Sequence, residues 1–327
     1  LFHLTVVSLY LLFLKAVVTL SLVLIDYERK RYMGSCGLLL GLAPMRLHLN
    51  SSIARCSATF LCDPSCFKQI RPICMASAST SSKPKLQSGR KLSFGTTHVI
   101  QPKGEHRATV VWLHGLGDVG ASWAEALEDL PLQNIKWIVP TAPVQPVAVM
   151  AGFPCNAWFD VGSLTEEGPN DLEGLDASAA HVAELLSKES ANVKLGVGGF
   201  SQGAATSMYT TACSFIGSYS DGTSFPCKLN ITVAISGWLP STKTIESRLK
   251  ENPEAIKGAK DYSIFLGHGT SDEIVLYKFG QKSAVALQAL GFSSLVFKTY
   301  KGLGHYTNST EMEDICTFLK ERLQLQG

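Results

Sequence analysis

Residues 96–327 lack the excess of positive charge that a nucleic-acid-binding domain carries. They hold 17 Lys+Arg against 24 Asp+Glu, a net charge of −7, whereas residues 1–95 hold 12 against 3. The whole-chain value of +2 hides this split. We therefore expect no nucleic-acid partner for the second part of the chain.

The cysteines lack the paired C-x-x-C spacing of a zinc site or a redox motif. Five of the nine lie in residues 1–95, and Cys155, Cys213, Cys227 and Cys316 are scattered over the rest. We expect no metal, and the odd, sparse set suits a reducing compartment such as the cytoplasm. A Cys213–Cys227 disulfide is the alternative for a secreted protein.

Acidic residues are scarce in the first 95 residues, which differ in kind from the remainder. Residues 4–25 are mostly apolar and long enough to span a bilayer, although Lys15 makes insertion costly. Residues 76–91 form a basic, Ser-rich linker. We expect a leader of low order over 1–95. Translated leader sequence, a membrane or signal segment, and an organelle transit peptide are the open alternatives for residues 1–90.

Residues 96–327 show no internal repeat but alternate between strand-like and helix-like segments. The expected strands are 108–113, 135–139, 194–200, 231–235, 262–266 and 295–300, and the expected helices are 123–130, 175–188, 203–211, 242–250, 276–290 and 309–325. This alternation predicts one α/β domain, with a mostly parallel sheet covered by helices on both faces.

A G-x-S-x-G pentapeptide, Gly199-Phe200-Ser201-Gln202-Gly203, stands between an expected strand and an expected helix. This setting is typical of a nucleophile elbow, in which small residues allow a sharp turn that exposes the serine hydroxyl. The pentapeptide alone is a weak signal in a chain with 28 glycines. It makes Ser201 the candidate nucleophile and Gln202 N–H a candidate oxyanion donor.

A serine nucleophile needs a histidine base and an acid that orients it, and in this fold class both follow the serine. Two histidines follow Ser201. We favour His305, in a Gly-rich loop after a late strand, over His268, which we expect to pack or shape a turn. For the acid we favour Asp272 over the neighbouring Glu273, although Asp272 also suits a helix cap.

The loop His114-Gly115-Leu116-Gly117-Asp118 follows the first predicted strand. A glycine-rich loop at this position supplies the second backbone donor of an oxyanion hole in such enzymes. His114 is an alternative base, but we expect it to prop the loop. Asp118 suits either a loop-fixing carboxylate or a helix cap.

Five motifs in order give the chain a family resemblance. They are residues 113–118, 198–203, 236–240 (Ser-Gly-Trp-Leu-Pro), 268–272 and 302–305. Over about residues 94–325 the chain resembles the acyl-protein thioesterase, lysophospholipase and carboxylesterase family of small α/β-hydrolases. The resemblance implies a catalytic triad of Ser201, Asp272 and His305, and an oxyanion hole formed by the N–H groups of Leu116 and Gln202.

The resemblance also implies hydrolysis of protein S-palmitoyl thioesters or lysophospholipids without a metal or cofactor. General carboxylesterase activity is an alternative, and a non-catalytic ligand receptor on the same scaffold is another. Peripheral membrane contact is possible, and the sequence does not set the oligomeric state. The residues expected to line an acyl channel are Leu116, Val147, Val149, Met150, Phe153, Trp158 and Trp238, each of which also suits ordinary core.

The chain departs from the family pattern in two places. Ala204 stands where many members have a third glycine, so we expect slight crowding at the start of the helix after Ser201. Residues 215–228 are polar, and we expect an inserted loop that could change what docks near the site.

Overall fold

The computed structural model describes residues 92–162 and 171–325. The predicted leader therefore lies outside the described residues up to residue 91, and it stays a prediction. No helix in the described part is long and apolar enough to cross a membrane.

A seven-stranded sheet forms the centre of the domain, in the order β1-β3-β2-β6-β7-β8-β9. Only β1, at one edge, pairs antiparallel with its neighbour. The strands are β1 (Thr97–Ile100), β2 (Ala108–Leu113), β3 (Ile135–Pro140), β6 (Lys194–Phe200), β7 (Ile231–Ile235), β8 (Ser263–Gly269) and β9 (Leu295–Tyr300). The central strands β2 and β7 are buried throughout, as the strands of a parallel sheet covered on both faces must be.

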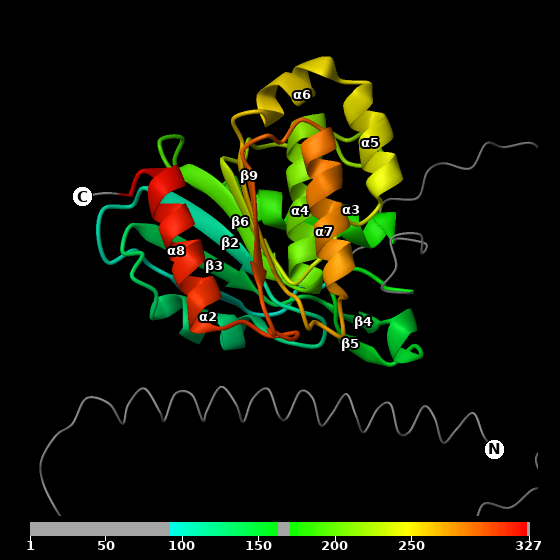
Figure 1. The fold of residues 1–327 in the computed structure, drawn as a ribbon, viewed down its shortest axis with the longest axis horizontal. Helices are drawn as coiled ribbons and strands as arrows, with labels where there is room; N and C mark the ends of the chain where they lie inside the picture. The colour runs from blue at the N-terminus through cyan, green and yellow to red at the C-terminus, as the bar shows by residue number, and fades with distance from the viewer. Residues whose placement is uncertain (1–91, 163–170, 326–327) are drawn as a thin grey trace, which may run out of the picture. The chain divides into compact units, whose positions relative to one another are not determined.

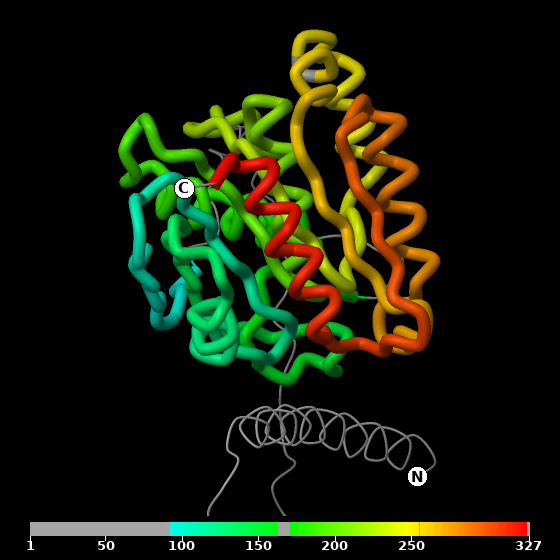
Figure 2. The backbone as a smooth tube through the Cα atoms, turned by 60° about the vertical axis from the view of Figure 1, so that its left-hand side comes forward, coloured from blue at the N-terminus to red at the C-terminus, as the bar shows by residue number. Residues whose placement is uncertain are grey.

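Helices cover both faces of this sheet (Figure 1). The α2 helix (Gly120–Glu128) and the α8 helix (Ser309–Leu323) pack on one face, and Figure 2 shows α8 lying diagonally across it. The opposite face carries α3 (Leu172–Leu186), α4 (Gln202–Ile216), α5 (Thr242–Lys250) and α7 (Tyr277–Ala289). This architecture confirms the predicted mostly parallel sheet with helices on both faces.

Several short elements were not expected from the sequence. They are β1, the two-stranded hairpin of β4 (Val144–Pro146) and β5 (Pro154–Asn156) with the 3-10 turn η1 (Ala148–Met150) inside it, and the short α6 (Pro253–Ala259). The hairpin follows β3, so it projects from the same edge of the sheet at which the parallel strands end (Figure 1).

The segment predicted as an inserted loop at 215–228 differs from that expectation in extent and position. The α4 helix continues to Ile216, so the loop begins only at Gly217, which has a φ of 83°. The segment then leads into the amino end of β7, at the edge of the sheet opposite Ser201. Arg248 holds it there by donating hydrogen bonds to Ser218 O at 3.1 Å and to Tyr219 O at 2.6 Å. The two ends of the segment therefore lie away from Ser201, and Ser220 N–H donates to Asp176 in the second turn of α3.

Candidate active site

Ser201 occupies a sharp turn between β6 and α4, with φ 56° and ψ −118°. Few non-glycine residues adopt a positive φ, and such strain clusters at functional sites. A Cβ at Gly199 would lie 2.6 Å from Leu113 O, and one at Gly203 only 2.1 Å from the same atom. Both glycines of the pentapeptide are thus required by close backbone approach, which is why the local pattern predicts the turn.

Ser201, His305 and Asp272 form one hydrogen-bonded chain at the carboxyl edge of the sheet. Ser201 Oγ lies 2.9 Å from His305 Nε2, and His305 Nδ1 lies 2.8 Å from Asp272 Oδ2. Because Asp272 only accepts at this position, Nδ1 carries the proton and Nε2 is free to accept from the serine. The three residues come from the ends of β6, β8 and β9, so the structure brings together the residues that the sequence selected.

The Asp272 carboxylate is fully buried yet well supplied with donors. Its Oδ1 accepts from the N–H groups of Ile274 and Val275, both at 2.9 Å. Burial opposes ionisation, but the nearby His268 ring and the hydrogen bond from His305 outweigh it and lower the pKa of Asp272 to about 2. The acid is therefore charged at neutral pH. Its bonds to Ile274 and Val275 fix the turn before α7 and do not cap that helix, because α7 begins only at Tyr277 and its N-cap residue Leu276 has no side-chain cap bond.

His268 lies against the same carboxylate from the other side. Its Nε2 donates to Val275 O at 2.7 Å and lies 3.4 Å from Asp272 Oδ2. The ring is buried, and a Cβ on Gly280 of α7 would lie 2.3 Å from Nδ1. His268 thus packs as predicted, and its contact with Asp272 is a feature that sequence reasoning did not find.

His114 props the loop after β2 and is not placed as a base. Its Nε2 accepts from Ala142 N–H at 3.0 Å, so Nδ1 carries the proton and donates to Gly115 O at 2.7 Å. Burial lowers the pKa of His114, which keeps the ring neutral. Its carbonyl oxygen accepts from Trp158 Nε1 at 2.8 Å, which ties this loop to the segment after β5.

The loop at 115–118 is anchored on both sides of Leu116. Gly117 N–H donates to Asn156 O at 2.8 Å, and Asn156 Nδ2 donates to Asp118 O at 2.9 Å. Gly117 has a φ of 79°, which favours glycine. No hydrogen bond within the described residues occupies the Leu116 N–H. This donor therefore remains available for a ligand.

Gln202 follows Ser201, and its side chain fixes the elbow to the segment after β5. Its Oε1 accepts from Trp158 N–H at 3.0 Å, and its Nε2 donates to Phe159 O at 2.8 Å. As the first residue of α4, Gln202 has a backbone N–H without a partner inside the helix. A helix N-terminus of this kind stabilises negative charge beside the serine.

The residues expected to line an acyl channel fall into two groups. Trp158, Trp238 and Val147 are buried and belong to the core cluster, and their role as channel lining stays a prediction. Leu116, Val149 and Met150 pack against that core and are only half-buried, and Phe153 is 56% exposed.

Exposed apolar side chains gather at the edge of the sheet that carries Ser201. Of seven exposed large apolar residues among those described, five lie on loops or hairpins at the carboxyl edge of the sheet, and they are Val119, Val144, Phe153, Leu276 and Tyr306. Sequence reasoning missed four of these, since single apolar residues in loops give no periodic signal.

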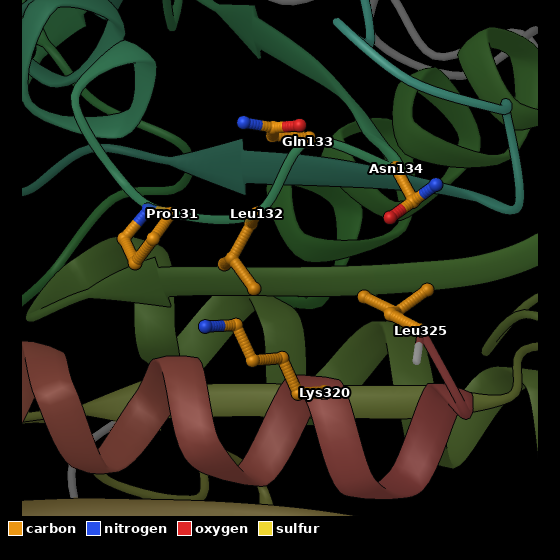
Figure 3. A pocket seen from close by; sticks show the side chains of 6 residues that line it. All are labelled: Pro131, Leu132, Gln133, Asn134, Lys320 and Leu325. Carbon is orange, nitrogen blue, oxygen red and sulfur yellow. The ribbon is translucent and has the colours of Figure 1, made fainter. Parts of the chain in front are cut away.

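A hollow of about 170 Å³ is lined by residues 131–134, Lys320 and Leu325. Figure 3 shows the Lys320 side chain reaching from α8 toward the 131–134 loop. These residues precede β3 and follow the middle of α8, so they lie at the amino edge of the sheet, opposite Ser201. This hollow is therefore separate from the candidate active site.

The four cysteines after residue 95 are free thiols, so the alternative Cys213–Cys227 disulfide is absent. Burial raises the pKa of Cys213 to about 12 and that of Cys227 to about 11. Both thiols are thus unreactive near neutral pH.

Comparison with known proteins places the chain in a family. The model of the phospholipase/carboxylesterase family matches residues 95–323. The acyl-protein thioesterase 1 homolog 1 of Dictyostelium discoideum is 34% identical over 227 residues, which cover 67% of this chain and 92% of that protein. The crystal structure of Zea mays acyl-protein thioesterase 2 is 55% identical, with a TM-score of 0.69, and covers 70% of this chain and 99% of its own. These matches confirm the resemblance, and the chain belongs to the phospholipase/carboxylesterase family of α/β-hydrolases.

Proposed function

We propose that the chain is a serine hydrolase of acyl thioesters and esters, with protein S-palmitoyl thioesters as its principal substrates. The observation that carries this proposal is the hydrogen-bonded triad on a strained elbow. Ser201 Oγ lies 2.9 Å from His305 Nε2, and His305 Nδ1 lies 2.8 Å from Asp272 Oδ2. A serine hydroxyl that is hydrogen-bonded to a histidine base is activated as a nucleophile, because the base can take its proton.

In the proposed first step, Ser201 Oγ bonds to the acyl carbon while its proton passes to His305 Nε2. The imidazolium that forms is stabilised by the buried Asp272 carboxylate. The carbon–sulfur bond then breaks, and the leaving thiolate takes the proton from Nε2. Water attacks the acyl-enzyme with the same base, which releases the fatty acid and regenerates Ser201.

The negative charge of the tetrahedral intermediate needs donors that are already in position. The backbone N–H groups of Leu116 and Gln202 are the proposed donors. The anchoring of the 115–118 loop to Asn156, and of Gln202 to residues 158–159, supports this role because it holds both backbones in place.

Two arguments support a long acyl chain on a protein thiol. The Dictyostelium and maize relatives are named as acyl-protein thioesterases. The apolar rim of Val119, Val144, Phe153, Leu276 and Tyr306 also suits a lipid substrate and peripheral contact with a membrane surface. A cytoplasmic location agrees with free cysteines and with palmitoylated thiols as substrates.

The test compares kcat/KM of the full chain on a palmitoylated cysteine peptide, a lysophospholipid and a short aryl ester. Ser201→Ala is the inactive variant, and Ser247→Ala, at an exposed position on α5, is the matched control. We expect kcat/KM for the thioester to exceed that for the other two substrates by about tenfold, a difference of about 1.4 kcal/mol in transition-state binding. Only the Ser201 variant should lose activity.

The other outcomes of this comparison identify the alternatives. If kcat/KM is highest for the lysophospholipid, the protein is a lysophospholipase. If only the aryl ester is turned over, it is a general carboxylesterase. Tight binding without turnover of any of them would favour the receptor function. Activity that survives in Ser201→Ala would contradict the nucleophile assignment itself.

A further inference from the structure

Glu311 is a buried carboxyl group that the proposed mechanism does not use. It lies in the first turn of α8, is 0% exposed, and neither of its side-chain oxygens has a hydrogen-bond partner among the described residues. None of the ion pairs of the described part involves it. A buried polar group without partners is rare enough to require an explanation.

The carboxyl group fits closely against β8, beside apolar side chains. A Cβ on Gly267 of β8 would lie 2.5 Å from Glu311 Oε1, and the same Cβ would meet Ile235 and the ring of Phe265 at 3.0 and 3.2 Å. The absence of a side chain at position 267 thus makes the room that Glu311 occupies. A charge in such a buried space lacks a hydrogen-bonded or ion-paired partner that would replace its hydration.

The titratable groups around Glu311 come from three elements and one loop. His268 lies on β8, Asp272 follows β8, and Asp314 lies on α8 itself. Tyr300 lies at the end of β9, and the charge of Glu311 raises its pKa. Burial is the strongest influence and raises the pKa of Glu311 to about 7. The nearby Thr307 hydroxyl and His268 ring oppose that rise, although neither has hydrogen-bond geometry toward the carboxyl group, and the two aspartates add to it.

Glu311 is tied to the loop that carries His305. Its N–H donates to the side chain of Asn308 at 2.9 Å, which caps α8. Thr307, two residues after His305, has a buried hydroxyl that also lacks a partner among the described residues. Any displacement of the first turn of α8 therefore reaches His305 through a short stretch of chain.

We propose that Glu311, in its protonated form, is a positioning residue that docks the start of α8 on β8 and so keeps His305 in line with Ser201 and Asp272. The inference rests on the proposed hydrolase function and deepens it. Ionisation of Glu311 places a second negative charge near Asp272 in a buried space. The first turn of α8 then shifts toward water and carries His305 out of line, so kcat falls on the alkaline side while KM stays constant.

The first test measures kcat and KM against pH on a short aryl ester, for the wild-type full chain and for Glu311→Gln. Glutamine keeps the shape of the side chain but stays neutral. Glu313→Gln, an exposed carboxyl on the same helix, is the matched control. We expect Glu311→Gln to match the wild type at pH 6 and to exceed its kcat by about fivefold at pH 8.5, with Glu313→Gln unchanged. An activity ratio that stays constant across pH overturns the proposal.

A second measurement uses the wild-type protein alone and depends neither on enzymatic activity nor on the folding of a variant. The infrared band of a protonated carboxyl group, followed in the wild type between pH 5 and 9, is expected to disappear with a midpoint near pH 7. Its absence at pH 6 overturns the proposal even if Glu311→Gln fails to fold. A protein that shows the band but hydrolyses no ester contradicts the proposed function and leaves Glu311 neutral as inferred, so the two failures are distinguishable.

Discussion

Ala204 and Gly237 share one space beneath the elbow, because a Cβ at position 237 would lie 2.6 Å from the Cβ of Ala204. The crowding expected from Ala204 is therefore relieved across the sheet, where Gly237 follows β7. We predict that Gly237→Ala lowers the free energy of unfolding by about 1–3 kcal/mol through overpacking. Urea unfolding measures the loss, and hydrolysis of a short ester shows whether the elbow has moved.

The double variant Ala204→Gly/Gly237→Ala tests the pairing. We expect it to recover part of the stability, since Ser201 O, at 3.0 Å from the same Cβ, still limits the space. A double-mutant cycle should give a coupling of about 1 kcal/mol. If the two effects simply add, the residues do not share the space as described.

Asp272→Asn should lower kcat by about 10³–10⁴-fold with little change in KM, because the amide no longer holds His305 in the reactive tautomer. The pKa of Asp272 is lowered to about 2, so its carboxylate is charged throughout pH 5–9 and the loss should be the same across that range. Glu273→Gln, at the exposed neighbour, serves as control. A larger loss in Glu273→Gln would transfer the role of the acid to that residue.

Glu311→Gln should change how stability depends on pH. The pKa of Glu311 is raised from 4.5 to about 7 on folding, so its contribution is complete below pH 4.5 and is lost as pH rises through 7. Relative to the wild type, the glutamine variant should gain up to about 3 kcal/mol between pH 5 and pH 8. Urea unfolding at the two pH values measures this gain, and an equal difference at both would show that Glu311 does not titrate in that window.

Arg248→Ala should lower the stability of the protein without lowering its catalytic rate. The guanidinium donates to the backbone of Ser218 and Tyr219, at the edge of the sheet away from Ser201. Loss of these charge-assisted bonds should cost about 1.5–3 kcal/mol, while kcat/KM on the palmitoyl peptide stays unchanged. A substrate-dependent loss of kcat/KM would mean that residues 217–228 do contact the substrate.

The central strands and the elbow could be predicted because their signals are local. The strand β6 and the start of α4 follow from an apolar run and from glycines that close approach to Leu113 requires. The strand β1 escaped prediction since it is short and lies at an edge, where its side chains are only partly buried. The hairpin of β4 and β5 contains Pro146 and Pro154, which argue against strands.

In the site, the sequence indicated which residues meet but not what supports them. Chain order and loop position were enough to select Asp272 and His305. The contact of His268 with Asp272 depends on the packing of Gly280, which no spacing reveals. Glu311 stands three residues after the helix cap Asn308, where a glutamate ordinarily caps the helix, so its burial against Gly267 gives no signal in the sequence.

The central claim is that Ser201 is the nucleophile of an acyl thioesterase. The most direct measurement treats the full chain with a long-chain alkyl fluorophosphonate, in which the serine oxygen displaces fluoride from phosphorus. Labelled peptides are then mapped by mass spectrometry while palmitoyl-thioester hydrolysis is followed. We predict one label per chain, on Ser201, and loss of hydrolysis in proportion to labelling. A label on another residue, or full labelling of Ser201 with hydrolysis intact, would contradict the account.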